Sequence, residues 1–386
     1  MIFVIADDIT GAAEIAGLGH AYGLTTTLLT RVPEALPQAQ LIVLATDTRS
    51  MNEMQAIAET RHICQSLQKS FATANERLIL FKKVDSAVRG HVVSELQTLL
   101  ENTAYQQVLY LPANPSKGRT IRGGCFYIDD VPVDQTKFAV DPEFPATEAS
   151  ICLRLRITPM SRIRVCDAIG PEDIRQAVRQ GMQAADLTLL AGAADLFCGL
   201  LEYLGHAEVA HPVAFAGLSL TAKPLIVCGS TQSTDLSSRP YIRKRNIPIS
   251  SMPRDVFDGN QGAAYWLSTL QVRHFLRTAI QPARNGLILN IPYESSCSAA
   301  AALRLRTEMS EVVHALVEKM QPDELIIEGG ATAFAVMQRL GWCDFCITEQ
   351  IAPGVVRMQS QQMPQVHVTF KPGSYPWGEA LFDYKY

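Results

Sequence analysis

The first seventeen residues, Met1–Gly17, read MIFVIADDITGAAEIAG, and their pattern decides how the rest of the chain is interpreted. An apolar, β-branched run stops abruptly at two adjacent carboxylates, Asp7 and Asp8, and small residues typical of a helix start follow. A continuous apolar run predicts a strand that is covered on both faces, as in a parallel sheet. Ligands of such sheets bind beyond the carboxyl ends of the strands, so the two carboxylates mark a candidate site.

The same alternation of apolar runs and helical patterns continues along the chain. The predicted strands are Ile2–Ile5, Leu41–Ala45, Leu78–Lys82, Val108–Leu111, Ile163–Cys166, Leu187–Leu190, Leu225–Cys228, Leu287–Ile291, Glu324–Ile327, Val355–Met358 and Val366–Phe370. Ser298–Met320 is the longest predicted helix. Strand–helix alternation of this kind predicts an α/β fold with mostly parallel sheets flanked by helices.

A chain of 386 residues is long for a single core, so we predict two domains. Helical periodicity fades between residues 206 and 224, and a new strand is predicted from Leu225. We therefore expect a first domain at 1–210 and a second at 222–386, with a cleft between them. Residues 103–150 are rich in Pro and Gly, and we interpret them as an excursion of the first domain.

Composition excludes several classes of function. The formal net charge of −4 offers no basic excess for nucleic acid or an anionic membrane surface. No apolar run approaches the ~20 residues that span a bilayer, and no signal peptide is evident. We expect a cytoplasmic protein with no nucleic-acid or membrane partner. Cys343 and Cys346 have zinc-knuckle spacing, but no second pair accompanies them, so no metal site is predicted.

Polar side chains follow each of the first four predicted strands. They are Asp7, Asp8 and Thr10; Asp47, Thr48 and Arg49; Lys83, Asp85, Ser86 and Arg89; and Asn114, Lys117 and Arg119. Arg and Lys suit the carboxylate of a small ligand, and an Asp can accept a proton from a hydroxyl. Each group alone has an ordinary alternative: Asp8 could cap a helix, and Asp85 and Arg89 could form a local ion pair.

The second half of the chain carries glycine turns between strands and helices. They occur in LIVCGSTQST at 225–234 and LIIEGGATAF at 325–334, and a third glycine-containing loop follows the last strand. Such turns let backbone N–H groups face an anion at a helix N-terminus. Neither a Walker A loop nor a dinucleotide fingerprint is present, and each turn alone could be purely structural. A hydroxy-acid lobe and a phosphate lobe together predict a kinase.

The blocks ADDITGA, KKVDSAVRGHVVSEL, PANPSKGRTIRGG, VCGS, EGGATA and KPGSYPWGEALF occur in this order along the chain. In this it resembles the four-carbon acid sugar kinases over nearly its whole length. The resemblance implies a sugar-acid-binding N-terminal domain and a nucleotide-binding C-terminal domain. It also implies Mg²⁺- and ATP-dependent phosphorylation of a terminal hydroxyl on an acid such as D-threonate, D-erythronate or 3-oxo-tetronate.

The resemblance also implies site residues. Those for the sugar acid are Asp7, Arg49, Lys83, Val84, Asp85 and Ser86. Those for ATP are Ser230, Gly329, Gly330, Ala331, Thr332 and Gly373. The chain departs from the family pattern at Ala331, where an acid is usual, at Ala87 and His91, and in the loop that contains Pro372 and Trp377.

In the mechanism we expect, Arg49 and Lys83 hold the substrate carboxylate, and one of Asp7, Asp8 and Asp85 accepts the hydroxyl proton. Asp7 is the first choice for this base and Asp85 the second. The partners are the sugar acid and ATP, with a homodimer left open. One rival is a two-lobed binding or regulatory protein without turnover, which Ala331 favours. Another is a dehydrogenase, against which the missing dinucleotide fingerprint argues.

Overall fold

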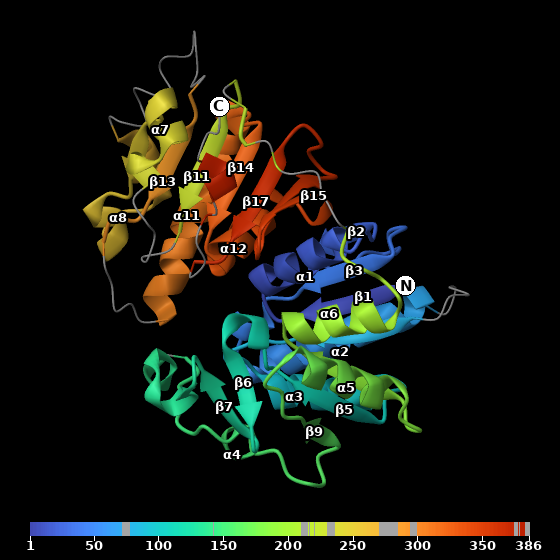
Figure 1. The fold of residues 1–386 in the computed structure, drawn as a ribbon. Helices are drawn as coiled ribbons and strands as arrows, with labels where there is room; N and C mark the ends of the chain where they lie inside the picture. Colours follow the sequence, from blue (N-terminus) through green and yellow to red (C-terminus); the bar gives the residue numbers. More distant parts are fainter. Residues whose placement is uncertain are drawn as a thin grey trace. The chain divides into compact units, whose positions relative to one another are not determined.

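The computed structural model describes residues 1–71, 78–141, 143–209, 215, 217–219, 221–229, 236–269, 285–293, 299–373, 377 and 379–382. The chain divides into two compact units, Met1–Ala210 and His211–Tyr386 (Figure 1). Both units contain a mostly parallel sheet with flanking helices, so the predicted α/β fold class is confirmed. None of the described helices is both long enough and apolar enough to cross a membrane.

The large sheet of the N-terminal unit is entirely parallel, with the order β2-β3-β1-β4-β10-β5-β9. Its strands are β1 (Ile2–Ala6), β2 (Thr26–Leu29), β3 (Leu41–Ala45), β4 (Ile79–Lys83), β5 (Gln107–Leu111), β9 (Ile163–Val165) and β10 (Thr188–Gly192). Every residue of β1 is buried, as its unbroken apolar sequence predicts. The sequence did not predict β2, because TTLL is short and half of it is threonine.

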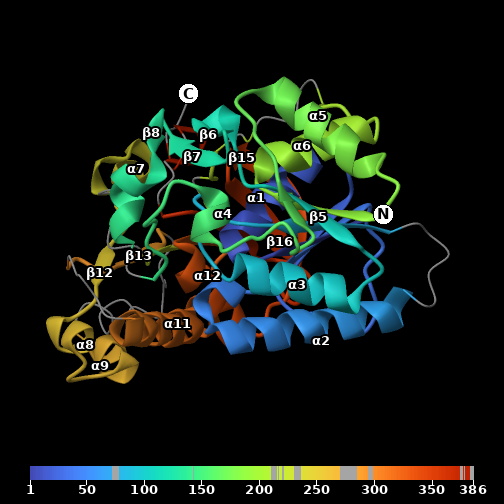
Figure 2. The same ribbon diagram turned by 90° about the horizontal axis from the view of Figure 1, so that it is seen from below.

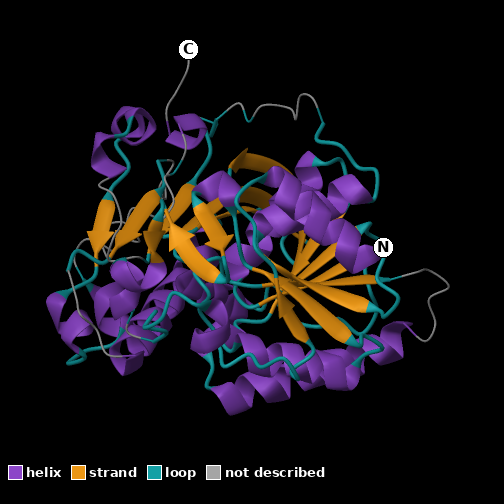
Figure 3. Cartoon of the chain, turned by 60° about the horizontal axis from the view of Figure 1, so that its bottom comes forward, coloured by secondary structure: helices purple, strands orange, loops and turns teal. Residues whose placement is uncertain are grey.

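Helices cover both faces of this sheet (Figures 2 and 3). They are α1 (Ile9–Ala21), α2 (Glu53–Phe71), α3 (Val92–Asn102), α5 (Pro171–Met182) and α6 (Ala194–Tyr203). The short helix α4 (Ile151–Arg154) lies next to the turn before β7, where the Ile151 N–H donates to the Gly124 carbonyl. In Figure 2, α2 and α3 lie side by side on one face, and α5 and α6 lie together on the other. Helix α1 contacts α6, so it belongs to the same layer as α5 and α6.

The topology of this sheet predicts where a ligand would bind. Strand β1 pairs with β3 on one side and with β4 on the other. After β1 the chain first builds β2 and β3 on one side and then crosses to β4, so the strand order reverses at β1. The crevice beyond the carboxyl ends of strands at such a switch point is the usual ligand site of open α/β sheets. The residues that follow β1, β3 and β4 include Asp7, Arg49 and Asp85.

The excursion at 103–150 contains a small antiparallel sheet, β6-β7-β8, that the sequence did not predict. Its strands are β6 (Arg119–Arg122), β7 (Cys125–Ile128) and β8 (Val131–Pro132). The short 3-10 helices of the unit are η1 (Thr48–Ser50), η2 (Pro115–Lys117), η3 (Val133–Gln135) and η4 (Lys137–Val140). The small sheet begins close to the carboxyl end of β5, because only η2 lies between β5 and β6.

The sheet of the C-terminal unit has the order β12-β13-β11-β14-β17-β16-β15. Its strands are β11 (Pro224–Cys228), β12 (Ile249–Ser251), β13 (Leu287–Asn290), β14 (Glu324–Glu328), β15 (Asp344–Ala352), β16 (Val355–Ser360) and β17 (His367–Lys371). The strands β12, β13, β11, β14 and β17 are parallel, whereas β16 runs antiparallel to both of its neighbours. Strands β12 and β15 were not predicted, since neither has a continuous apolar run.

The helices of the C-terminal unit are α7 (Pro240–Arg245), α8 (Arg254–Asp258), α9 (Ala263–Ser268), α11 (Ala299–Met320), α12 (Gly330–Leu340) and α13 (Glu379–Phe382), with the 3-10 helix η5 (Leu236–Ser238). Helix α11 matches the long predicted helix to within one residue and packs against α12. A buried cluster joins Tyr241, Trp377 and Phe382 to the sheet residues Ile226 and Ile326. Gly229 and Gly329 directly follow β11 and β14, at the carboxyl ends of these strands.

Candidate active site

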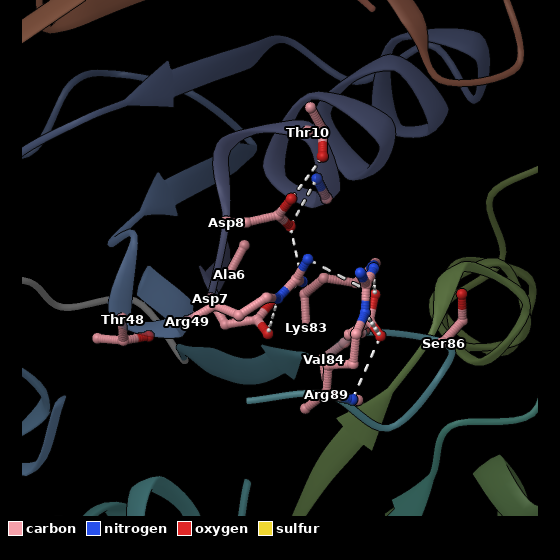
Figure 4. A network of polar contacts seen from close by, with 12 residues as sticks. Ala6, Asp7, Asp8, Thr10, Thr48, Arg49, Lys83, Val84, Ser86 and Arg89 are labelled. Atoms are coloured by element: carbon pink, nitrogen blue, oxygen red, sulfur yellow. Dashed lines mark hydrogen bonds and ion pairs between the residues drawn. The ribbon is translucent and has the colours of Figure 1, made fainter. Parts of the chain in front are cut away.

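Asp7 and Arg49 form the centre of a charged cluster in the N-terminal unit (Figure 4). Asp7 directly follows β1 and is almost fully buried, and Arg49 lies in η1 after β3. The Arg49 guanidinium donates from Nε to Oδ2 of Asp7 at 3.0 Å and from Nη2 to Oδ1 at 2.8 Å. The backbone N–H of Arg49 also donates to the Asp7 carbonyl at 3.2 Å. The two strand ends are therefore joined through both side chain and backbone.

Arg49 serves two further carboxylates besides that of Asp7. Its Nη2 donates to Oδ1 of Asp8 at 3.0 Å, and its Nη1 lies 3.6 Å from Oδ1 of Asp85. Burial alone would lower the pKa of Arg49, but the charges of these aspartates raise it well above its ordinary value. The guanidinium is thus a clamp that holds three acids from two strand ends together.

Asp8 is the N-cap of α1. Its Oδ1 accepts a hydrogen bond from the backbone N–H of Gly11 at 3.0 Å, and its Oδ2 accepts one from the Thr10 hydroxyl. Burial favours a higher pKa for Asp8, but Arg49 and Lys83 outweigh it and the pKa is lowered. A Cβ at Gly11 would lie 2.6 Å from the Asp8 carboxylate, so a larger residue here would displace that carboxylate. The helix-cap interpretation of Asp8 is confirmed.

Asp85 is the most heavily hydrogen-bonded acid of the cluster. Its Oδ2 accepts from the backbone N–H groups of Ala87 at 3.0 Å and Arg89 at 3.2 Å, and from Nε of Arg89 at 2.9 Å. Its Oδ1 accepts from Nη2 of Arg89 at 3.0 Å. Burial would raise the pKa of Asp85, but Arg49 and Arg89 lower it far more. The local ion pair anticipated from the sequence is confirmed, and it makes Asp85 a weak base.

The remaining predicted sugar-acid residues lie in the same region. Lys83 donates to the carbonyl of Val84 at 3.0 Å and lies 3.5 Å from Oε2 of Glu14 in α1. Val84 is buried, and its N–H donates to the Gly192 carbonyl at 3.1 Å. The hydroxyl of Ser86 accepts from Arg119. The structure therefore brings all six predicted residues to the ends of β1, β3 and β4.

Sequence reasoning missed Glu14, which binds both Lys83 and Lys117. Burial would raise the pKa of Glu14, but the two lysines lower it. The one feature of the sequence that could have indicated Glu14 is that it is a carboxylate among the small apolar residues of α1.

Sequence reasoning also missed a second buried network, which is formed by Lys82, Glu95 and Thr48. Lys82 pairs with Glu95 at 2.6 Å, and Glu95 accepts from the Thr48 hydroxyl at 3.0 Å. Because Thr48 precedes Arg49 in η1, this network fixes the segment that carries the clamp.

In the C-terminal unit the predicted ATP residues form two turns. Gly329 has φ of 100° and caps α12, and Gly330, Ala331 and Thr332 form the first turn of that helix. A Cβ at Gly229, after β11, would lie 2.2 to 2.6 Å from side-chain atoms of Thr332. The turns after β11 and β14 are therefore in contact, as a shared anion cradle requires. Ser230 lies outside the described residues.

Comparison with known proteins places these two units. Residues 2–157 match a family model described as a sugar-binding N-terminal domain, and residues 273–375 match one described as a nucleotide-binding C-terminal domain. Together the two matches span more than half of the chain. The chain belongs to the four-carbon acid sugar kinase family.

Relatives in the family match along most of their length. A 3-oxo-tetronate kinase of Brucella melitensis is 27% identical, over 91% of this chain and 88% of the relative. A D-threonate kinase of Bordetella bronchiseptica is 26% identical, over 92% of this chain and 88% of the relative. Among solved structures, a Salmonella typhimurium protein called a putative tRNA synthase superposes with a TM-score of 0.74 at 20% identity, covering 99% of this chain and 97% of that protein. That likeness supports the fold.

Two departures from the family pattern now have a structural description. His91 is the N-cap residue of α3, its Nε2 lies 2.7 Å from the Met51 carbonyl, and its ring meets Phe144 edge-on. His91 therefore supports the start of α3 through these contacts. Ala331, where the family usually has an acid, lies in the first turn of α12 and offers only its backbone to a ligand.

Glu328 does not supply a free acid in place of Ala331. It is buried and forms an ion pair with Lys371, whose Nζ also lies 3.4 Å from the carbonyl of Gly373. Burial raises the pKa of Glu328, and the Lys371 charge offsets only part of this effect. Gly373, the last of the predicted ATP residues, thus lies next to the Lys371 ammonium group.

Proposed function

We propose that this protein transfers the γ-phosphate of ATP to a terminal hydroxyl of a four-carbon sugar acid of the D-threonate, D-erythronate or 3-oxo-tetronate class. The observation that carries the proposal is the convergence of Asp7, Arg49 and Asp85 at the strand switch point of the unit that matches a sugar-binding model. The kinase names of relatives that match along nearly the whole chain support it.

Asp7 is the group best suited to accept the hydroxyl proton. Asp8 caps a helix, and Asp85 accepts four hydrogen bonds, so neither has the basicity or the free lone pairs for this role. Each oxygen of Asp7 accepts one hydrogen bond from the Arg49 side chain and keeps a lone pair for a substrate hydroxyl. Arg49 orients this carboxylate through these two hydrogen bonds.

In the proposed reaction the substrate hydroxyl oxygen forms a bond to the γ-phosphorus of ATP. The bond from that phosphorus to the β,γ-bridging oxygen breaks, ADP leaves with its electron pair, and the hydroxyl proton passes to Asp7. Phosphoryl transfer depends mostly on positioning and charge neutralisation, so a well-positioned carboxylate is sufficient as the base.

The nucleotide phosphates would bind at the turns of the C-terminal unit. A helix start leaves its first N–H groups without intrahelical partners, and in α12 these include Gly330, Ala331 and Thr332. The N–H of Gly329 is already used, because it donates to the Lys371 carbonyl at 2.9 Å. Gly229 permits the close approach of the neighbouring turn. We include Ser230 and Gly373 in this proposal on the resemblance to the family.

Mg²⁺ is proposed as the companion of ATP, with charge neutralisation of the phosphates as its role. The described residues form no group of three metal-binding side chains, and the acid next to the glycine turn, Glu328, is paired with Lys371. Kinases commonly hold Mg²⁺ through phosphate oxygens, water and one or two carboxylates. We therefore assign no protein ligand to it.

A screen of four-carbon sugar acids with Mg-ATP, measured as ADP release, tests the proposal. Acid-dependent ADP release with at least one member of the panel is the expected result. Binding of ATP and of an acid without ADP release would instead support a binding or regulatory homologue, which the missing acid at Ala331 favours. Erythritol and threitol, which lack the carboxylate, serve as controls for the acid requirement.

A further inference from the structure

We infer that Arg119, rather than Arg49 or Lys83, is the cation that binds the substrate carboxylate and selects sugar acids over uncharged polyols. This inference rests on the proposed function and names a residue outside the predicted contact set. It differs from the expectation that Arg49 and Lys83 hold the substrate carboxylate.

The other cations around the cluster are already paired with protein carboxylates. Arg49 binds Asp7 and Asp8, and Arg89 binds Asp85 through two guanidinium nitrogens. The two lysines, Lys83 and Lys117, both pair with Glu14. A substrate carboxylate that recruited any of these cations would compete with a buried protein carboxylate and leave it uncompensated.

Arg119 differs from these cations. Its guanidinium donates to the neutral hydroxyl of Ser86, and in the described part of the chain no carboxylate oxygen lies within 4.0 Å of it. Its position beside the cluster is evident at Asp85, whose pKa is raised by burial but lowered more by Arg49, Arg89 and Arg119. Arg119 is half-buried, in contrast to the almost fully buried Lys83.

Arg154 is the other nearby guanidinium without an ion pair among the described residues, but it has a different task. Its Nη1 donates to the Ala87 carbonyl at 3.4 Å, and its Nη2 donates to the Phe144 carbonyl at 3.3 Å. These bonds join the loop after β4 to the excursion at 103–150. Both of its terminal nitrogens are therefore already engaged by backbone carbonyls.

The backbone of Arg119 is held rigidly, as a specificity residue requires. Its N–H donates to the carbonyl of Asn114 at 3.2 Å, and its carbonyl accepts from Asn114 at 2.8 Å. Asn114 is buried, and its Oδ1 accepts from the backbone of Asp195 at 2.9 Å. Gly118, with φ of 67°, makes the preceding turn, where a Cβ would lie 2.2 Å from Asp129.

The chemistry of the pair fits a carboxylate. The planar guanidinium of Arg119 can donate two parallel hydrogen bonds to the two oxygens of a carboxylate. The adjacent Ser86 hydroxyl can rotate to donate a third. Asp7, which we propose as the base, would then act on a hydroxyl of the same substrate. With Arg119 as the cation and Asp7 as the base, the site would select an acid whose reactive hydroxyl is distant from its carboxylate.

The test compares Arg119→Gln and Arg119→Lys with the wild-type protein. The matched control is Arg122→Gln, because Arg122 lies on the same strand, β6, and pairs with the exposed Asp130. Calorimetry measures the Kd of the four-carbon acid that the wild type turns over fastest, and steady-state assays measure kcat and KM for it. Circular dichroism and Tm verify that each variant is folded.

We expect Arg119→Gln to raise the Kd and KM of the acid about 100-fold or more, as charge-assisted bidentate pairs do when truncated, with a smaller change in kcat. Arg119→Lys should recover part of the affinity, and Arg122→Gln should match the wild type. A wild-type Kd in folded Arg119→Gln would overturn this inference alone. A wild-type protein that neither binds nor phosphorylates any four-carbon acid would overturn the proposed function as well.

Discussion

The Arg49 guanidinium binds both carboxylate oxygens of Asp7, from Nε at 3.0 Å and from Nη2 at 2.8 Å. The two residues lie 42 positions apart and follow neighbouring parallel strands, β1 and β3. Because both side chains are largely buried, the pair fixes the orientation of the Asp7 carboxylate at the strand switch point. The predictions below follow from this arrangement and from the corresponding turns in the C-terminal unit.

Asp7→Asn should lower kcat for the sugar acid about 10²- to 10⁴-fold, the usual range for loss of a general base. The KM for ATP should change little, since the substitution is isosteric. Asp130→Asn, at an exposed position, is the matched control. If kcat of Asp7→Asn stays near that of the wild type, another residue accepts the proton.

Arg49→Met should lower the free energy of unfolding by about 3–5 kcal/mol, the cost of leaving a buried charge without its partner. The loss should exceed that of Arg122→Met, whose partner Asp130 is exposed. Urea unfolding of both variants measures the difference. Adding Asp7→Asn to Arg49→Met should restore part of the stability, because it removes one of the uncompensated carboxylates. Additive losses in the double variant would contradict a direct interaction.

The folded-state pKa of Asp85 lies below its ordinary value of 3.8, because Arg49 and Arg89 outweigh the effect of burial. A lowered folded-state pKa stabilises the protein above the unfolded-state pKa, and this contribution declines as the pH falls below that value toward the folded-state pKa. The difference in unfolding free energy between wild type and Asp85→Asn should therefore be large at pH 6 and shrink toward pH 3. Urea unfolding at several pH values measures it, and a constant difference would contradict the assignment.

Gly229→Ala should destabilise the C-terminal unit by about 1–3 kcal/mol, as overpacking does, and raise the KM for ATP. The new methyl group would meet the Thr332 side chain, whose atoms lie 2.2 to 2.6 Å from the Cβ position. Gly170→Ala is the steric control, because no atom lies within 4 Å of its Cβ position. Tm and ATP kinetics report both effects, and unchanged values for Gly229→Ala would argue against contact between the two turns.

The strands that the sequence predicted are those with continuous apolar runs, because such runs are typical of strands buried on both faces. Leu41–Ala45 agrees exactly with β3, and the other predicted strands agree to within one or two residues at each end. Strand β15 was missed because it is paired with the antiparallel β16 and contains polar residues along its length. Polar or short strands carry too little of this signal.

The candidate site shows the same limit at the level of single residues. Acids and cations after strand ends were predictable from position, but their pairings were not. Lys82 and Lys83 are adjacent in sequence, and strand alternation sends them to opposite faces, where one meets Glu95 and the other Glu14. Arg119 lies in a Pro- and Gly-rich excursion with no strand signal, so its place beside Ser86 became evident only in three dimensions.

The most direct test of the central claim is to detect the transferred phosphate. The protein would be incubated with Mg-ATP and each four-carbon acid, and ³¹P NMR would be used to look for a phosphate monoester of the acid. We predict stoichiometric formation of ADP and the acid phosphate with the wild type, and a strongly reduced rate with Asp7→Asn. Absence of any acid phosphate, from folded wild-type protein that binds ATP, would contradict the account.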